Sequence, residues 1–239
     1  MTGVAFFDVD ETLITVKSTF SFLRFWLAEN GDDGAKYAEI TGDIKQRAAE
    51  GEAREEINRQ YYRAYRGVTQ AELYQAGQRW FAEFSAGGTA FYVDVVEALR
   101  AHQDSDDRIV LLSGSFAPAI TPVAAVLGAD RIIATTPVVD RRGLLTGAVE
   151  RPLVGTAKGA AVLDYLRESG ISVRDSYGYG NHASDLPFLE LVTHRAYRGA
   201  DPVLSRVAAQ GGDWLHLGDR VGDATGVAAD PADQAAAVW

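Results

Sequence analysis

The sequence predicts an α/β protein with a Rossmann-like parallel sheet and an inserted all-helical segment. After about residue 89, short apolar runs alternate with helical patterns, and strand–helix–strand connections of this kind give parallel strands. Residues 17–88 interrupt that alternation after the first strand, with helical spacing and no strand pattern. The inserted segment is therefore predicted to be a cap that lies outside the sheet.

The amino-terminal part of the chain begins with an apolar run at residues 4–7 that ends in Asp8. Such a run predicts a buried strand, and residues 10–15 after it predict a turn. Ser18 can cap a helix whose aromatic residues lie at helical spacing. In residues 34–86, apolar side chains recur along one helix face with charges between them, which predicts the rest of the cap.

The later part of the chain carries the alternating pattern. Its apolar or aromatic runs predict strands over residues 108–112, 132–134, 175–180, 192–197 and 214–217. Helical spacing, or a Ser or Thr that can cap, predicts helices over residues 90–102, 118–127, 157–168, 184–191 and 202–210. A Gly-centred turn at residues 140–143 predicts a hairpin.

These elements divide the chain into three predicted parts. Residues 1–16 and 89–217 form the α/β core, and residues 17–88 form the helical cap. Residues 218–239 are rich in Ala, Asp and Gly with few apolar anchors, and they predict a loose tail.

Composition excludes several classes of function. The 239 residues include 23 Lys and Arg against 33 Asp and Glu, a formal net charge of −10, which argues against nucleic acid or an anionic membrane as a partner. The sequence has no Cys, so disulfides, a thiolate nucleophile and Cys-bound zinc are excluded. No apolar stretch reaches the roughly 18 residues of a spanning helix, and the amino terminus does not read as a leader. We expect a cytoplasmic protein.

Polar side chains stand just past the predicted strands, where ligands bind in open parallel sheets. Asp8, Asp10 and Thr12 follow the first strand, and Ser113 and Gly114 follow the second. One carboxylate can attack phosphorus, and the other, two residues on, can pass a proton. The remaining parts are Lys158 at the start of a helix, and Asn181 and Asp185 past a later strand.

This set of groups matches the needs of phosphoryl transfer. A hard cation held by oxygens can neutralise the phosphoryl oxygens, and Lys158 with the Ser113 hydroxyl can stabilise developing charge. Each residue alone also fits an ordinary structural role: a turn for the D-x-D pattern, a solvated helix position for Lys158, a helix start for Asp185. Their combination, each at the end of a strand or helix, favours the functional interpretation.

The chain resembles the haloacid dehalogenase superfamily of phosphohydrolases, and within it the branch that contains phosphoserine phosphatase, with a helical cap. The resemblance rests on four motifs and covers about residues 1–217. They are FFDVDETL at Phe6–Leu13, LLSGSF at Leu111–Phe116, Lys158 in VGTAKGAAV after the hairpin, and YGYGNHASDLPFLELV at Tyr177–Val192.

The resemblance implies a role for each matching residue. Asp8 would be the nucleophile and a Mg²⁺ ligand. Asp10 would be the general acid and then the base, with its main-chain carbonyl on the metal, and Thr12 would hold the Asp10 region in place. The groups that bind the phosphoryl group would be Ser113, the Gly114 amide and Lys158.

Two positions depart from the family pattern. Asn181 stands where the family has Asp, so the implied metal set is Asp8, Asp10, Asn181 and Asp185, and either of the last two could be the direct ligand. Mg²⁺ prefers oxygen, so His182 is interpreted as a surface or packing residue. Lys17 stands where phosphoserine phosphatase has an acidic residue that meets the substrate ammonium. Lys17 is therefore a candidate substrate contact that disfavours phosphoserine.

The sequence thus predicts a Mg²⁺-dependent phosphomonoesterase that hydrolyses a small phosphorylated metabolite through an aspartyl-phosphate. Two alternatives stay open at this point. A phosphotransferase or mutase on the same fold would pass the phosphoryl group to another acceptor. A catalytically weak module would only bind a phosphorylated ligand, and Asn181 keeps that alternative open.

Overall fold

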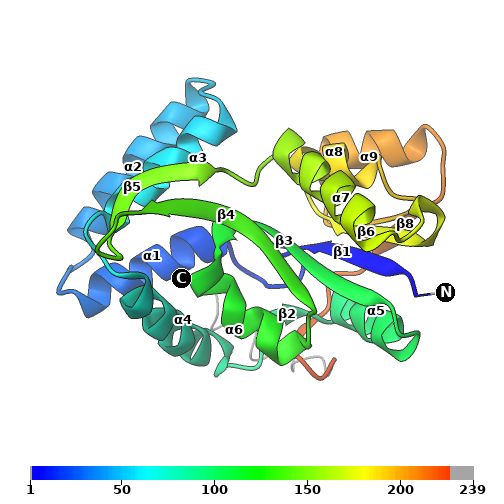
Figure 1. Ribbon diagram of the computed structural model, residues 1–239, viewed down its shortest axis with the longest axis horizontal. Helices are drawn as coiled ribbons and strands as arrows, with labels where there is room; N and C mark the ends of the chain where they lie inside the picture. The colour runs from blue at the N-terminus through cyan, green and yellow to red at the C-terminus, as the bar shows by residue number, and fades with distance from the viewer. Residues whose placement is uncertain (1, 227–239) are drawn as a thin grey trace.

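The computed structural model describes residues 2–226 and is built around one seven-stranded sheet. The strand order is β5-β4-β3-β1-β6-β7-β8 (Figure 1). Neighbouring strands are parallel except β4 and β5, which form an antiparallel hairpin. The strands are β1 (Val4–Asp8), β3 (Arg108–Phe116), β4 (Arg131–Val139), β5 (Leu145–Arg151), β6 (Ser176–Gly180), β7 (His194–Arg198) and β8 (Trp214–Leu217). The predicted parallel α/β sheet is confirmed.

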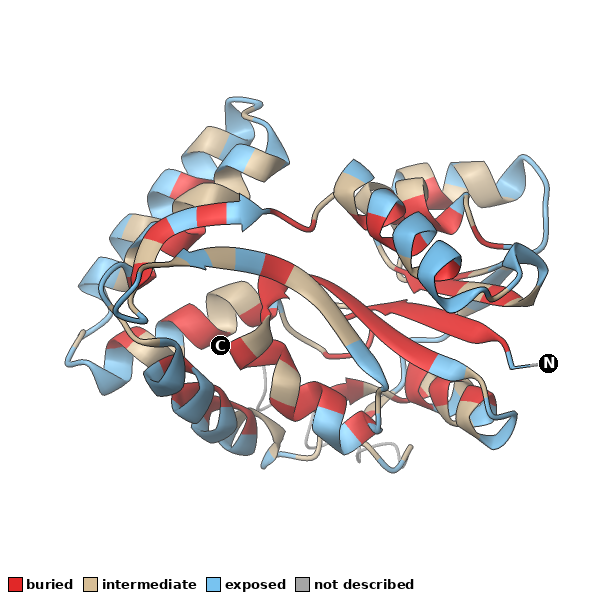
Figure 2. Ribbon diagram, in the orientation of Figure 1, coloured by how far each residue is buried: buried red, intermediate tan, exposed pale blue. Residues whose placement is uncertain are grey.

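The central strand β1 is buried on both faces because its side chains alternate between two apolar clusters. Ala5 and Phe7 pack with α5 (Val93–Asp104) and α6 (Ala117–Leu127). Val4 and Phe6 pack on the other face. The helices of that face are α7 (Thr156–Ser169), α8 (Leu186–Leu189) and α9 (Pro202–Ala209). Figure 2 shows the buried strands between these two helical layers.

The inserted segment is helical, as predicted. Its helices are α1 (Ser18–Glu29), α2 (Ala35–Ala49), α3 (Arg54–Tyr62) and α4 (Gln70–Ser85). They lie between β1 and a short strand, β2 (Phe91–Tyr92), and contribute to the same apolar cluster as α5 and α6. At the start of α4, Thr69 and Glu72 form a reciprocal capping box, which satisfies two backbone donors that the helix itself cannot. Helix α1 begins at Ser18 itself, so the prediction that Ser18 caps the helix is wrong. The Ser18 N–H donates to the Asp10 carboxylate.

The β4–β5 hairpin is longer than the sequence predicts and reaches the cap. The expected strand covered only residues 132–134, because Thr and Pro residues interrupt the apolar run after it. Leu145 exchanges two backbone hydrogen bonds of 2.8 Å with residues 67 and 68 at the end of the cap segment before α4. The Arg59 guanidinium of α3 donates to the Val149 carbonyl at 2.6 Å. The hairpin therefore links the cap to the sheet.

The segment after Gly218 was predicted to be loose, but its described part is anchored. Strand β9 (Val221–Gly222) pairs antiparallel with β2. The guanidinium of Arg220 lies 2.6 Å from carboxylate oxygens of both Asp94 and Glu97 on α5. Ion pairs and backbone bonds make this anchor, so an apolar pattern could not reveal it. The rest of the predicted tail, residues 227–239, lies outside the described residues, and the division into core, cap and tail stays a prediction.

Candidate active site

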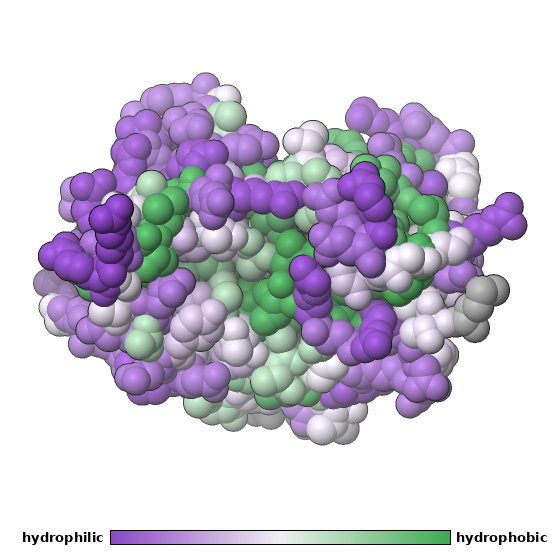
Figure 3. Space-filling model, in the orientation of Figure 1, coloured by the Kyte–Doolittle hydropathy of each residue, from purple (hydrophilic) through white to green (hydrophobic). Residues whose placement is uncertain are grey.

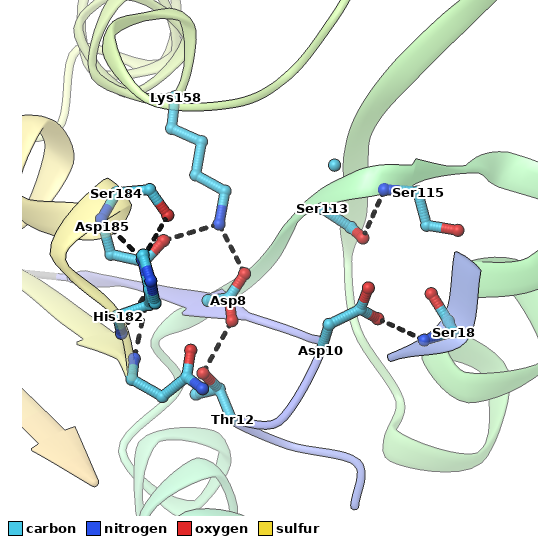
Figure 4. Close-up of polar contacts among 12 residues, drawn as sticks. Asp8, Asp10, Thr12, Ser18, Ser113, Ser115, Lys158, His182, Ser184 and Asp185 are labelled. Atoms are coloured by element: carbon cyan, nitrogen blue, oxygen red, sulfur yellow. Dashed lines mark hydrogen bonds and ion pairs between the residues drawn. The ribbon is translucent and has the colours of Figure 1, made fainter. Parts of the chain in front are cut away.

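Three charged side chains meet at the carboxyl edge of the sheet. Asp8 ends β1, Lys158 lies in the first turn of α7, and Asp185 follows β6 (Figure 4). The Lys158 Nζ donates to Asp8 Oδ1 at 2.5 Å and to Asp185 Oδ1 at 2.7 Å. All three residues are at most 5% exposed. The fold thus brings together residues that lie far apart in the sequence.

Two glycines allow this close approach. A Cβ at Gly159 would stand 2.6 Å from the Pro187 carbonyl oxygen, so only glycine lets α7 lie against the segment that follows Asp185. A Cβ at Gly180 would stand 2.9 Å from the Asp185 Cβ. Real Cβ atoms do not approach this closely in packed interiors. Lys158 reaches both carboxylates because these positions carry no side chain.

Thr12 holds the nucleophile candidate. Its hydroxyl donates to Asp8 Oδ2 at 2.7 Å. The resemblance implies that Thr12 holds the Asp10 region in place, and that role stays a prediction; the contact that the structure gives the Thr12 hydroxyl is the one to Asp8. The turn after β1 folds Thr12 back by way of its N–H bond to the Val9 carbonyl, which brings the hydroxyl to Asp8. Both Asp8 oxygens therefore accept hydrogen bonds, one from Lys158 and one from Thr12.

Asp10 lies on the cap side of the site. Its Oδ1 accepts from the Ser18 N–H at 3.1 Å, at the start of α1. Figure 4 shows the Asp10 carboxylate turned toward Ser18, while the Asp8 carboxylate is turned toward Lys158. Burial raises the pKa of Asp10 to about 6, against the opposing effect of its hydrogen bonds with Ser18. A carboxyl group with this pKa can hold a proton near neutral pH and also release it.

Asp185 has a hydrogen-bond partner on each oxygen. Oδ1 accepts from Lys158, and Oδ2 accepts from the N–H groups of Asn181 and His182, each at 3.2 Å. Asp185 therefore orients Lys158 and closes the loop after β6. Asn181 is half-buried and uses its backbone N–H in this loop, so its side-chain oxygen takes no part in this contact with Asp185.

His182 belongs to the loop and to its contact with the cap. Its Nδ1 accepts from the Ser184 N–H at 3.0 Å and lies 2.9 Å from the Arg54 guanidinium of α3. Burial lowers the pKa of His182, and the Arg54 cation lowers it further. These contacts fit the surface role that the sequence predicted.

The charge balance of the site is set by two carboxylates around one ammonium. Burial raises the pKa of Asp8 to about 7, Lys158 opposes that rise, and Asp185 adds to it. Burial lowers the pKa of Lys158, but Asp185 and Asp8 together hold it above its usual value. Lys158 is therefore an ammonium ion. When both carboxyl groups are ionised, two negative charges face one ammonium, and this excess of buried negative charge is costly.

The phosphate-binding candidates Ser113 and Gly114 lie near the end of β3. The buried Ser113 hydroxyl oxygen accepts from the Ser115 N–H at 3.0 Å. Three donors meet at the Gly114 carbonyl: Asn58 Nδ2 at 2.8 Å, the Thr135 hydroxyl at 2.8 Å and the Tyr62 hydroxyl at 3.2 Å. Asn58 and Tyr62 come from the cap helix α3. The cap thus binds the predicted phosphate-binding segment directly.

Sequence reasoning missed Asn58 and Thr135. Asn58 sits in a helical pattern full of polar residues, and nothing in its spacing separates it from a solvated position. Tyr62 is fully buried. Lys17, the candidate substrate contact, lies 3.4 Å from Glu11 with about half of its side chain exposed. Its role as a substrate contact stays a prediction.

The donor set fits a hard cation. No group of three or more His, Cys, Asp or Glu in residues 2–226 is arranged to hold a metal. The implied set instead mixes the Asp8 carboxylate, the Asp10 main-chain carbonyl and the Asn181 amide oxygen with Asp185. All of these are oxygen ligands of the kind that Mg²⁺ prefers. The excess negative charge around Asp8 gives a cation an electrostatic reason to bind there.

A cavity of about 210 Å³ lies beside the phosphate-binding candidates, and one of its lining residues is Thr135, which donates to the Gly114 carbonyl. It is lined by residues of α4, β4 and the start of α6, with one residue each from the end of β3 and the start of β5; the lining includes Tyr74, Phe116 and Ile132. None of the predicted site residues lines it. Figure 3 shows hydrophobic residues gathered in a hollow on one face of the molecule, with hydrophilic residues around them. In the structure, the predicted site itself is closed over Asp8 and Lys158.

The chain belongs to the haloacid dehalogenase-like hydrolase family, whose model matches residues 5–190. It is 32% identical over 117 residues to an "inhibition of morphological differentiation protein" of Streptomyces azureus, covering 49% of this chain and 42% of that protein. It is 25% identical over 232 residues to a histidinol-phosphatase of Neisseria meningitidis serogroup C, covering 89% and 97%. The chain spans less than half the length of the first of these relatives.

Solved structures share the fold. A Bordetella pertussis Tohama I protein of unknown function superposes with a TM-score of 0.79 at 26% identity, covering 90% of this chain and 99% of that one. A substrate-bound phosphoserine phosphatase superposes with a TM-score of 0.65 at 20% identity, covering 90% and 93%. The second likeness supports the fold, with its helical cap.

No helix in residues 2–226 is long and apolar enough to span a membrane.

Proposed function

We propose that the protein is a Mg²⁺-dependent phosphomonoesterase that hydrolyses a small organic phosphate through an aspartyl-phosphate on Asp8. The observation that carries the proposal is the buried contact of Lys158 with both Asp8 and Asp185 at the carboxyl edge of the sheet. A family of hydrolases and a full-length relative called a histidinol-phosphatase support it.

The first half of the reaction uses Asp8 and Asp10. A carboxylate oxygen of Asp8 attacks phosphorus, and the bond from phosphorus to the ester oxygen breaks. Asp10 gives its proton to the departing oxygen, which leaves as an alcohol. With its pKa raised to about 6, Asp10 retains part of its protonated population near neutral pH.

The second half releases phosphate. Asp10, now ionised, takes a proton from water as that water attacks phosphorus, and the bond between Asp8 and phosphorus breaks. Lys158, the Ser113 hydroxyl and the Gly114 N–H donate to the phosphoryl oxygens in both halves. Lys158 keeps its position because Asp185 holds it at 2.7 Å.

The metal would be held by the Asp8 carboxylate, the Asp10 main-chain carbonyl and the Asn181 side-chain oxygen. When bound, it supplies positive charge that neutralises the phosphoryl oxygens and part of the charge on Asp8. Asp185 is the alternative ligand. Its oxygens accept hydrogen bonds from Lys158 and from the N–H groups of Asn181 and His182, and we place Asn181 first because it stands at the position where the family has Asp.

A phosphate-release screen tests this function. The purified protein is assayed against a panel of metabolite phosphates with and without Mg²⁺, and inorganic phosphate is measured. We expect release from at least one ester that depends on Mg²⁺. Transfer of the phosphoryl group to a second metabolite without free phosphate would point to a phosphotransferase. Absence of any turnover, of an aryl phosphate as well, would contradict the proposal.

Substrate charge gives a prediction about Lys17. A cation at this position repels an ammonium group, and its side chain is half exposed beside Glu11. We expect phosphoserine to be a poor substrate relative to sugar, polyol or carboxylate-bearing phosphate esters. The Lys17→Glu variant should raise kcat/KM for phosphoserine relative to kcat/KM for these esters. Values of kcat/KM across the panel measure this. If phosphoserine is the best substrate of the unaltered protein, this role of Lys17 is wrong.

The metal site gives a prediction about Asn181. Restoring the family carboxylate with Asn181→Asp should lower the Mg²⁺ concentration for half-maximal activity about tenfold, equivalent to roughly 1.4 kcal/mol. A Mg²⁺ titration of activity measures the shift, and the Mg²⁺-dependent rise in Tm gives a second readout. The control is His182→Asp, which adds the same charge one residue away. Unchanged or weaker Mg²⁺ affinity in Asn181→Asp would make Asp185 the better ligand.

A further inference from the structure

Arg198 places a buried guanidinium beneath the turn that follows β1. It is the last residue of β7, and its side chain is 10% exposed. Nη1 donates to the Glu11 carbonyl, and Nη2 donates to the Asp219 carboxylate at 2.7 Å. The guanidinium carbon lies 3.4 Å from the centre of the Tyr92 ring. One side chain thus connects β7, the turn after β1 and the segment after β8.

The turn that Arg198 contacts carries the proposed catalytic groups. Glu11 stands between Asp10 and Thr12 and has a φ of +57°, which is costly for a residue with a side chain. Among residues 2–226, Asp106 is the other non-glycine residue with positive φ. The peptide of Glu11 therefore needs support from outside the turn. The Arg198 guanidinium supplies a charge-assisted hydrogen bond to its carbonyl.

We propose that Arg198 is a positioning residue for the reaction: it fixes the Glu11 peptide and so sets the position of Asp10 relative to Asp8. The inference rests on the proposed function, in which Asp10 transfers the proton. A small displacement of a proton donor is costly, since a misplacement of about 1 Å can lower turnover on the order of 100-fold. Arg198 itself touches neither substrate nor metal in this role.

The contacts of Arg198 favour a role in positioning the turn over a role in stability alone. The Asp219 carboxylate is 63% exposed, so its ion pair with Arg198 is open to solvent and weak. The buried Nε of Arg198 finds no hydrogen-bond partner among residues 2–226, and a group placed for stability alone is normally satisfied. The contact that is directed at the site is the one to Glu11, and it is part-buried. A lysine lacks the planar guanidinium that lies over the Tyr92 ring and donates from two separate nitrogens.

The experiment compares Arg198→Met with Arg220→Met, the matched control. Arg220 lies next to Asp219 in the segment after β8 and holds two ion pairs with α5, but it contacts no site residue. For Arg198→Met we expect kcat to fall about 100-fold with KM within about twofold, because binding groups stay in place. Arg220→Met should keep kcat within about twofold. The kcat of Arg198→Lys, which keeps a donor, should lie between the values of the two Met variants. Arg198→Lys also replaces Arg198→Met in the comparison if Arg198→Met does not fold.

Amide hydrogen exchange separates this inference from the proposed function. In Arg198→Met, exchange should rise in residues 10–16 more than in residues 93–97, and in Arg220→Met the order should reverse. If the unaltered protein has no phosphatase activity, the proposed function is wrong. Amide exchange of residues 10–16 would still show whether Arg198 holds the turn. Equal kcat and equal exchange of residues 10–16 in the two variants would overturn the proposal.

Discussion

Replacing Asp8 with Asn is expected to lower turnover by several orders of magnitude while the fold stays intact. The change keeps the shape of the side chain and removes the attacking carboxylate, and covalent catalysis has no second route here. Stability should hold or rise, because the variant leaves one ammonium facing one carboxylate, Asp185, in place of two. Steady-state phosphate release and thermal unfolding measure the two effects.

The control for this experiment is Thr12→Val, which removes the hydrogen bond to Asp8 Oδ2 and leaves the nucleophile in place. It should lose far less activity than Asp8→Asn. An Asp8→Asn protein that keeps more than about a tenth of wild-type turnover would contradict the nucleophile assignment.

Replacing Lys158 with Met should reduce both activity and stability. The variant leaves Asp8 and Asp185 buried and facing each other without the ammonium, which typically costs roughly 3–5 kcal/mol. Turnover should fall by about three orders of magnitude, since a cation that stabilises the transferring phosphoryl group is lost. Chemical denaturation and phosphate release measure these losses.

The stability loss should depend on pH with a definite sign. The pKa of Asp8 is already about 7 with Lys158 present, and removing the ammonium raises it further. A carboxyl group whose folded-state pKa lies above its unfolded-state pKa destabilises the protein as pH rises between the two values. Lys158→Met should therefore be closer to wild-type stability at pH 5 than at pH 8. Combining it with Asp185→Asn should restore stability but not activity. An equal loss at both pH values would contradict the buried charge cluster.

Much of the site could be predicted because strand ends are visible in the sequence. Apolar runs located the carboxyl ends of β1 and β6, and the geometry of parallel sheets then placed Asp8 and Asp185 at one edge. The predicted end of β3 at residue 112 was wrong, because the strand continues to Phe116 and includes Ser113 and Gly114. Lys158 was predicted to be near them, and the structure places it within hydrogen-bond distance of both. Long-range pairing was not predictable. Asn58 reaches Gly114 from a helix 56 residues earlier in the chain, and only the folded cap brings them together.

Other differences have the same origin. Thr12 bonds to Asp8 because of how the turn closes, which depends on the left-handed conformation of Glu11. That conformation leaves no signal in a residue of this type. Strand β9 is too short for an alternating pattern, and its partner β2 is a two-residue strand. The anchoring role of Arg198 likewise depends on three segments that meet only in the folded protein.

The central claim is that Asp8 becomes phosphorylated during turnover, and trapping that intermediate tests it most directly. The protein is mixed with its best substrate and Mg²⁺, quenched in acid during steady state and digested, and the peptide that contains Asp8 is examined by mass spectrometry. The account predicts a peptide heavier by one phosphoryl group, with the label on Asp8, present with substrate and absent in Asp8→Asn. An active enzyme whose label lies on another residue would contradict it.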